Sequence, residues 1–258
     1  MNSPASESPL KDAAILVLGF LAIVFAFYFV FVNVTDWAFT RISIQTEMKL
    51  FGGLWPESKK SEAMPEDFKT FTNALVSQTG LPLRVSVICE KTPNAYALPG
   101  GVIHLTSGLF DTLKTKNGAA FVLGHEIGHF INRDHIRGVG RQLIFAVGAS
   151  LFGFSNLTSL GAFDSLIARS FDRDQESNAD RYAEKLVKQV YGHTWGGEEF
   201  FATMAKDESS FTNALSRFSS THPLSSERLK EIRKTQMGPE PQLQVSADHF
   251  ASWTAHCR

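Results

Sequence analysis

Two histidines and a glutamate in the middle of the chain have the residue types and spacing of a metal-dependent hydrolytic site. His125, Glu126 and His129 form the pattern H-E-x-x-H within residues 119–132, which are predicted to be helical. Residues four apart share one face of a helix, so both imidazoles would point at one metal ion, typically zinc. Glu126 would lie beside the metal and take a proton from water. The alternative is a chance match in which both histidines are ordinary helix residues.

A later segment supplies the carboxylate that such a site requires. A catalytic zinc ion has three protein ligands and one open position. Glu176 and Asp180 are four residues apart, and apolar residues continue at helical spacing after them. Glu176 would bind the metal, and Asp180 would accept a hydrogen bond from a ligand histidine and fix its orientation. The alternative is a solvated acidic helix face.

The beginning of the chain predicts a membrane anchor. Residues 1–12 are polar and expected to be disordered, whereas residues 13–34 are apolar and uncharged over the length of one spanning helix. A cleaved signal peptide is the alternative, but residues 33–37 offer no small-x-small cleavage site, so we expect a retained single-pass anchor. Positive charges are nearly balanced across it and leave the orientation open. An extracytoplasmic or periplasmic domain is the working prediction.

The rest of the chain predicts one α+β domain, predominantly helical with a small sheet, at residues 62–236. Residues 83–88 and 102–106 alternate like strands, with turn-rich residues 93–101 between them. Residues 35–61 form a juxtamembrane link that either packs on the domain or lies at the membrane surface. The apolar residues 143–168 predict a hairpin of two short helices, with a re-entrant membrane hairpin as the alternative.

Composition and cysteine content narrow the functional classes. The 25 Lys and Arg residues are scattered and balance 26 Asp and Glu residues, so no nucleic-acid partner is expected. Two cysteines are too few for a disulfide framework. Cys89 lies in an apolar alternating run and is expected to be a buried free thiol, and no sequence feature supports its pairing with Cys257. Residues 237–258 are expected to be an unstructured tail, although its His249, His256 and Cys257 could bind metal loosely.

Four motifs in order resemble the HtpX-like family of zinc metalloendopeptidases, gluzincins that include CAAX prenyl proteases and BepA-type periplasmic proteases. They are residues 94–101, residues 125–129, residues 176–180, and His222-Pro223 with Arg228, within residues 65–236. The resemblance implies a zincin-like domain that binds one zinc ion through His125, His129 and Glu176, with Glu126 as the base. It also implies that His222 and Arg228 lie near the metal, where they could stabilise an oxyanion.

A polypeptide substrate is expected to lie along residues 102–106. An open strand edge near the metal can pair with an extended peptide and hold its scissile bond. The expected substrate-binding residues are Asn94, Ala95, Val102, Ile103, His104 and Leu105. The alternative is that these strands only build the core, with His104 as a packing residue.

The sequence therefore predicts a membrane-anchored zinc endopeptidase that acts on unfolded or misfolded proteins. One alternative is a membrane-tethered, chaperone-like binding module with a latent zinc site, which the intact Glu126 disfavours. Another is a lipid-processing or prenyl-protein enzyme, which the single anchor disfavours. The natural substrate and the oligomeric state stay open.

Overall fold

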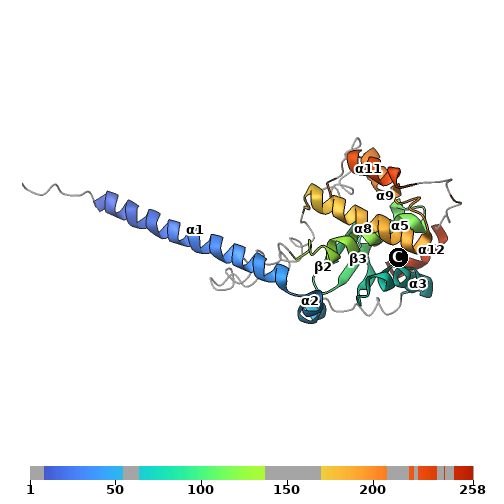
Figure 1. Ribbon diagram of the computed structural model, residues 1–258, viewed down its shortest axis with the longest axis horizontal. Coiled ribbons are helices and arrows are strands. Elements are labelled where there is room, and N and C mark those ends of the chain that lie inside the picture. The colour runs from blue at the N-terminus through green and yellow to red at the C-terminus, as the bar shows by residue number, and fades with distance from the viewer. Residues whose placement is uncertain are drawn as a thin grey trace, which may run out of the picture.

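The computed structural model describes residues 9–54, 64–136, 170–207, 221–223, 226–236, 241 and 247–257. The apolar hairpin predicted at residues 143–168 lies outside these ranges, as do residues 1–8 and 55–63. In Figure 1 a long first helix projects away from a folded body that holds the sheet and the helices around it.

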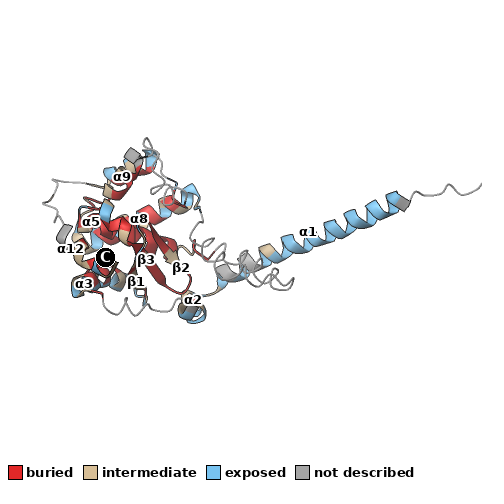
Figure 2. Cartoon of the chain, turned by 180° about the vertical axis from the view of Figure 1, so that it is seen from behind, coloured by how far each residue is buried: buried red, intermediate tan, exposed pale blue. Residues whose placement is uncertain are grey.

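The projecting helix has the length and composition of a membrane span. α1 (Pro9–Arg41) contains the 25-residue stretch Leu10–Val34, in which an 18-residue window reaches a mean hydropathy of 3.0 with no buried residue. Figure 2 shows exposed residues along nearly all of α1, in contrast to the buried body. A long helix that is apolar on every face and carries no buried residue in this stretch suits a bilayer, and α1 therefore fits a membrane anchor.

A short second helix joins α1 to the body. α2 (Ile44–Phe51) starts after Ser43, whose hydroxyl accepts a hydrogen bond from the Thr46 amide at 3.1 Å, and the 3-10 turn η1 (Gly52–Leu54) follows it. Only Ile42 and Ser43 separate α2 from α1. The Glu47 side chain of α2 is buried. This part of the juxtamembrane link therefore packs on the domain.

Three short strands form a mixed sheet in the order β1-β3-β2. β1 (Arg84–Ile88) runs parallel to β3 (Val102–Thr106), and β2 (Ala95–Leu98) pairs antiparallel with the other side of β3. β2 lies inside the segment predicted to be turn-rich, because pairing with β3 outweighs the local turn signals.

The sheet order corrects one expectation about the substrate. Residues 102–106 were expected to offer an open edge, but β3 is the central strand and pairs on both sides. Val102, Ile103 and Leu105 are buried in the core. Among the described strands, the edges belong to β1 and β2, so a peptide can add only to one of those.

Helices surround this sheet and enclose the core. They are α3 (Glu66–Val76) with the 3-10 turn η2 (Ser77–Thr79), α4 (Ser107–Thr112), α5 (Lys116–Ile131), α8 (Arg173–Tyr191), α9 (Glu199–Asp207), α11 (Ser226–Lys234), and α12 (Ala247–Trp253) with the turn η4 (Ala255–Cys257). α5 is buried over almost its whole length, which explains its many apolar and small residues. The mostly helical fold with a small sheet confirms the predicted α+β class.

α5 and α8 lie side by side (Figure 1) because small residues line their contact. A Cβ atom added at Gly124 would lie 3.1 Å from Ala183 Cα, and one added at Gly128 would lie 2.9 Å from Ala179 Cα. Glycine leaves space for the neighbouring backbone at both points. This close approach brings the helix with the H-E-x-x-H pattern against the helix that carries Glu176.

The end of the described chain belongs to the core, so the expectation of an unstructured tail is wrong for residues 247–257. Trp253 is fully buried, and its ring centroid lies 5.2 Å from Phe68, 4.8 Å from Phe71 and 5.5 Å from Phe110. The indole N–H donates a hydrogen bond to Asp67 Oδ2 at 2.8 Å. The buried indole ring contributes a large apolar surface, and its single polar atom has a hydrogen-bond partner, so Trp253 stabilises the packing of this segment on the core.

A disulfide fastens the same segment to the sheet. Cys89 follows β1 and is bonded to Cys257 in η4. The prediction of a buried free thiol is therefore wrong, since Cys89 is exposed and paired. The two cysteines are 168 residues apart, and only the tertiary fold brings them together.

Candidate metal centre

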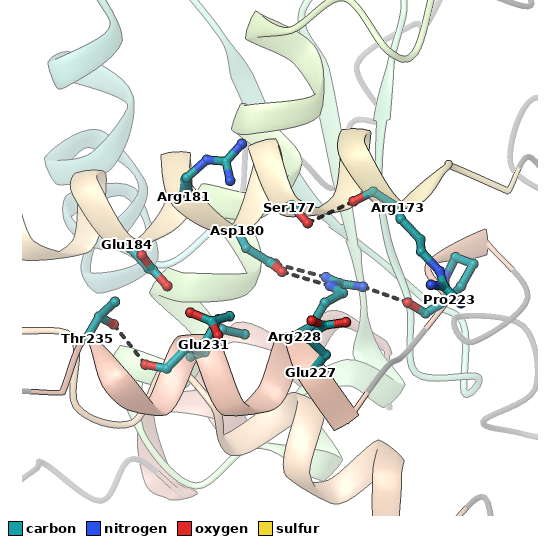
Figure 3. A pocket seen from close by; sticks show the side chains of 11 residues that line it. Arg173, Ser177, Asp180, Arg181, Glu184, Pro223, Glu227, Arg228, Glu231 and Thr235 are labelled. Carbon is teal, nitrogen blue, oxygen red and sulfur yellow. Dashed lines mark hydrogen bonds and ion pairs between the residues drawn. The ribbon is translucent and has the colours of Figure 1, made fainter.

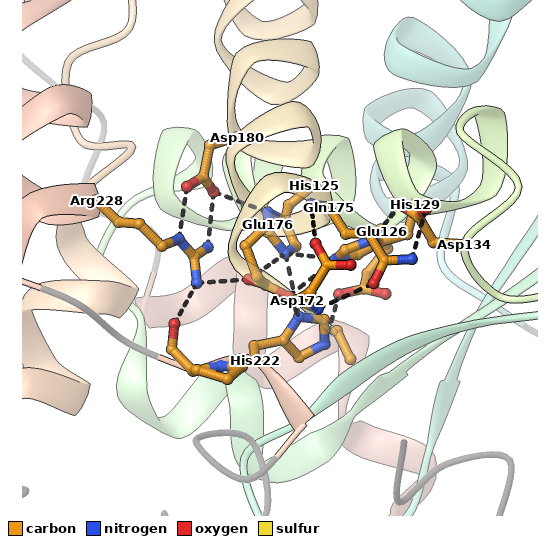
Figure 4. Close-up of polar contacts among 12 residues, drawn as sticks. His125, Glu126, His129, Asp134, Asp172, Gln175, Glu176, Asp180, His222 and Arg228 are labelled. Carbon is orange, nitrogen blue, oxygen red and sulfur yellow. Dashed lines mark hydrogen bonds and ion pairs between the residues drawn. The ribbon is translucent and has the colours of Figure 1, made fainter. Parts of the chain in front are cut away.

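Four buried side chains from three parts of the chain meet at one point (Figure 4). His125 and His129 come from α5, Glu176 from α8, and His222 from residues 221–223. Their ligand atoms all lie within 4.8 Å of one another. Such a group could hold a metal ion.

The distances within this group suit a tetrahedral ion. The Nε2 atoms of His125 and His129 are 3.1 Å apart, and carboxylate oxygens of Glu176 lie 3.6 Å and 3.4 Å from them. Ligand atoms about 2.0–2.2 Å from a tetrahedral zinc ion are themselves about 3.3 Å apart. Helical periodicity sets the distance between the histidines, and the close α5–α8 contact brings in the carboxylate.

Carboxylates fix the tautomers of both α5 histidines. His125 Nδ1–H donates to Asp180 Oδ1 at 2.9 Å, and His129 Nδ1–H donates to Asp134 Oδ2 at 3.0 Å. Each Nε2 atom is then left with a lone pair rather than a proton. Two ring nitrogens that face each other at 3.1 Å need either a shared proton or a cation between their lone pairs. The donor set therefore fits a bound metal.

Asp134 and Phe171 are site residues that the sequence analysis does not identify. Asp134 follows the end of α5, and its Oδ1 accepts a hydrogen bond from Gln175 Nε2 at 2.9 Å. The Phe171 ring stacks on the His129 ring at a centroid distance of 3.9 Å. A carboxylate five residues after the second histidine was the available signal for Asp134. No spacing signal pointed to Phe171.

Arg228 on α11 completes the network around the ligands. Its Nε and Nη2 atoms donate to the two oxygens of Asp180 at 2.7 Å and 2.8 Å, and its Nη1 lies 2.5 Å from Glu176 Oε2. Burial alone would raise the pKa of Asp180, but hydrogen bonds from Arg228 and His125 lower it. Asp180 therefore stays ionised and can hold His125.

Glu126 lies beside the four-residue group without joining it. Its Oε2 accepts a hydrogen bond from the Ala97 amide of β2 at 3.1 Å, whereas its buried Oε1 has no hydrogen-bond partner among the described residues. Burial raises the pKa of Glu126 to about 7, against the opposing effect of the neighbouring histidines. A carboxyl group with a pKa near neutrality can both accept and return a proton, although a bound cation would lower that pKa.

Two cavities adjoin the site, and the smaller one borders Glu126. It has a volume of about 20 Å³ and is lined by β2, Glu126, His135 and His222. The larger one, about 450 Å³, lies between α8 and α11 (Figure 3), and none of the four side chains of the candidate metal centre lines it. The paired Asp180 and Arg228 form part of its wall. The β2 side is therefore the side from which Glu126 can be reached.

The residues expected to bind substrate have different surroundings. Ala95 begins the edge strand β2, and Asn94 precedes it with Oδ1 accepting a hydrogen bond from the Ala95 amide at 2.9 Å. His104 on the central strand is 2.7 Å from Ser86 Oγ, and burial lowers its pKa to about 4, with a further contribution from Arg84. It is therefore neutral at pH 7 and lies outside the metal-binding group, as a packing residue does.

The part of the chain that contains this site is similar to known proteins. Residues 64–236 match the model of peptidase family M48. The chain is 31% identical to the metalloprotease LoiP of Escherichia coli K12 over 176 residues, which are 64% of this chain and 67% of LoiP. It is 26% identical to the mitochondrial metalloendopeptidase OMA1 of Schizosaccharomyces pombe over 185 residues, 70% of this chain and 54% of OMA1.

A third relative is matched over a longer part of the chain. The identity to the beta-barrel assembly-enhancing protease of Yersinia pestis is 25% over 228 residues, 78% of this chain. The match spans only 46% of that relative, so the chain corresponds to about half the length of this protein and of OMA1. The family model covers more than half of the chain and confirms the resemblance drawn from the four motifs. The protein therefore belongs to peptidase family M48.

Proposed function

We propose that this metalloendopeptidase hydrolyses peptide bonds of unfolded or misfolded proteins, with zinc bound by His125, His129 and Glu176. The observation that carries the proposal is the pair of facing Nε2 lone pairs beside the buried, partly unpartnered carboxylate of Glu126. A bound zinc ion supplies Lewis-acid activation of water and of the scissile carbonyl. Glu126 takes the proton of the attacking water and returns it to the leaving amine.

The substrate is proposed to pair with β2. The Ala97 amide of this edge strand points at Glu126, so the free edge of β2 faces the metal centre. An extended peptide added to this edge brings one of its carbonyl groups next to the ligands. Most backbone groups of a folded protein are already paired or buried, whereas those of an unfolded chain can pair with β2, which supports unfolded chains as the substrate class.

His222 and Arg228 are proposed to have different roles. His222 Nε2 lies 3.6 Å from Glu126 Oε1 and borders the small cavity, where an N–H group can stabilise charge that develops on the carbonyl oxygen. Arg228 contacts Glu176 and Asp180 instead. It therefore holds the ligands in position and acts on the reaction only through them.

One observation favours a second candidate function. His222 Nδ1 lies 3.2 Å from His125 Nε2 and 2.9 Å from Glu176 Oε1, which are distances between ligands of one ion. If this ring occupies the fourth position permanently, the domain is a membrane-tethered, chaperone-like module with a latent site. Casein cleavage measured with and without a chelator separates the two functions, because a latent site gives no chelator-sensitive cleavage.

The membrane side is part of the proposal. Disulfides persist in oxidising compartments and are rare in the cytosol. The Cys89–Cys257 bridge therefore supports a catalytic domain on the extracytoplasmic side, held there by α1.

Replacement of the base tests the mechanism. Glu126→Gln keeps the size of the side chain but removes its basicity, so we expect retained zinc and fold with a loss of proteolysis of about 10²- to 10⁴-fold. Casein cleavage, zinc content and thermal unfolding are measured together, with Glu66→Gln at an exposed position of α3 as the control. Cleavage by Glu126→Gln at the wild-type rate would show that the base is misassigned.

A further inference from the structure

A buried carboxylate on the helix that follows the membrane anchor contacts two parts of the active site. Glu47 is fully buried on α2. Its Oε1 accepts hydrogen bonds from the Gly100 amide at 3.0 Å and from His135 Nε2 at 2.7 Å, and its Oε2 accepts one from Arg133 Nη1 at 2.6 Å. One side chain of the juxtamembrane link thus joins the turn after β2 to the turn after α5.

The turn after α5 carries Asp134, which orients the proposed ligand His129. Glu47 binds the side chains on either side of Asp134, those of Arg133 and His135. Arg133 has a φ of +66°, a left-handed conformation uncommon for residues other than glycine. This conformation is held at the end of α5 by restraints such as the hydrogen bond from the Asp134 amide to the His129 carbonyl at 2.9 Å. The ion pair with Glu47 supplies such a restraint on the backbone next to Asp134.

The same contact reaches the proposed substrate cleft. Gly100 follows the edge strand β2, and its amide is held by Glu47. His135 lines the small cavity beside Glu126, and its ring stacks on Phe130 of α5 at a centroid distance of 4.5 Å. The Glu47 carboxylate therefore contacts both walls of the cleft, one at the end of β2 and one at the end of α5.

The backbone of the link is packed against the same turn. A Cβ atom added at Gly100 would lie 2.5 Å from the Gly52 amide nitrogen and 2.6 Å from the Phe51 carbonyl carbon. At Gly101 the added atom would lie 2.5 Å from Met48 Cε. Both glycines also have positive φ values, +92° and +80°. The Gly100-Gly101 pair is thus required for α2 to dock, in addition to shaping the turn.

We propose that α2 is a positioning element of the active site and that Glu47 is its central residue. Glu47 holds the end of β2 for substrate and holds Asp134 on His129 for the metal. The proposal rests on the proposed function of the site. It implies that the membrane-proximal link sets both substrate affinity and metal affinity. Two residues, Ile42 and Ser43, separate the anchor helix from α2 along the chain.

Two variants of the full-length, detergent-solubilised protein test the inference independently. Glu47→Gln removes the charge and places an NH₂ donor either against Arg133 or against His135 and the Gly100 amide, because these donors contact different oxygens of Glu47. Gly100→Ala forces α2 to move, and Glu47 with it, while the side chains of α2 and of the metal centre keep their chemical identity. The controls are Glu66→Gln at an exposed carboxylate and Gly53→Ala, where an added Cβ meets no atom within 4 Å.

Cleavage of a quenched fluorescent peptide with an unstructured casein sequence gives kcat and KM at saturating zinc. We expect KM to rise by about tenfold or more in both variants, while kcat stays within about threefold of the wild type. In a chelator competition, the zinc affinity of Glu47→Gln should fall about 10- to 100-fold. Both controls are expected to match the wild type. A purely structural role would lower the melting temperature and leave the KM of the folded protein unchanged.

A wild-type KM in either folded variant would overturn the inference. If Glu47→Gln does not fold, Gly100→Ala decides. The zinc competition does not depend on catalysis, so it tests the role of Glu47 separately from the proposed function. An unchanged zinc affinity in Glu47→Gln would count against the role of Glu47 whatever the activity of Glu126→Gln. Loss of activity in Glu126→Gln with unchanged KM in Glu47→Gln would refute the role of α2 alone.

Discussion

The close contact between α5 and α8 makes Gly128→Ala an informative substitution. The added Cβ would lie 2.9 Å from Ala179 Cα and 3.0 Å from Ala179 O, whereas ordinary contacts begin at 3.4 Å. The two helices must therefore separate by about 0.5 Å or rotate, and a metal site tolerates displacements of only about 0.2 Å in its bond lengths. His129 is the next residue on α5, and Glu176 lies one turn before Ala179 on α8.

The expected changes in stability and in metal binding differ in size. Alanine favours the helical conformation over glycine by about 1 kcal/mol, whereas overpacking a core costs about 1–3 kcal/mol. We therefore expect the free energy of unfolding to fall by only zero to about 2 kcal/mol. Misplaced ligands are more costly, and we expect zinc affinity and peptide cleavage to fall at least about tenfold.

The assay compares Gly128→Ala with Gly124→Ala, where the nearest atom, Ala183 Cα, is 3.1 Å from the added Cβ and the required shift is smaller. Chelator competition gives the zinc affinity, and denaturant unfolding gives the stability. Gly128→Ala should lose more zinc affinity than Gly124→Ala, although both gain the same helix propensity. Wild-type zinc affinity in Gly128→Ala would refute the idea that close backbone approach places Glu176 at the site.

Two further predictions concern the network around the ligands and the disulfide. Asp180→Asn removes the charge that pairs with the buried Arg228, and we expect the free energy of unfolding to fall by about 3–5 kcal/mol. Zinc affinity should fall about 10- to 100-fold, because Asp180 also orients His125. The control is Asp174→Asn at an exposed position, and equal zinc affinity in the two variants would contradict this prediction. Because the pKa of Asp180 is lowered in the folded state, this stabilisation is present above the ordinary aspartate pKa and is lost as the pH falls through the lowered value. Reducing the Cys89–Cys257 bridge opens a loop of 168 residues and should cost up to about 5 kcal/mol, measured as a lower denaturation midpoint with reductant; an unchanged midpoint would show that the bridge adds no stability.

The side chains of the candidate metal centre could be predicted from the sequence because their spacing is local. His125 and His129 share a face through helical periodicity, and Glu176 and Asp180 share another in the same way. Periodicity within one helix does not predict which helix packs against it. The contact between α5 and α8 depends on small residues, with Gly124 against Ala183 and Gly128 against Ala179.

Other features depended on contacts that no local pattern encodes. Glu47 looks like an ordinary polar residue of a short amphipathic helix, and only the fold places it against Arg133 and His135. The segment around β2 contains proline and glycine, so its turn signals hid the edge strand next to Glu126. The prediction of an unstructured tail is wrong because Trp253 packs on Phe110, Phe71 and Phe68, which lie 143 or more residues earlier in the chain.

This docking of the last described segment has a consequence for biosynthesis. Phe68 and Phe71 are among the first residues of the domain to be made, and the indole that covers them is among the last. A nascent chain that has not yet released residues 247–257 from the ribosome or translocon leaves this aromatic cluster open to water. The aromatic core can therefore be completed only after residues 247–257 have been made, and until then its exposed apolar surface favours aggregation.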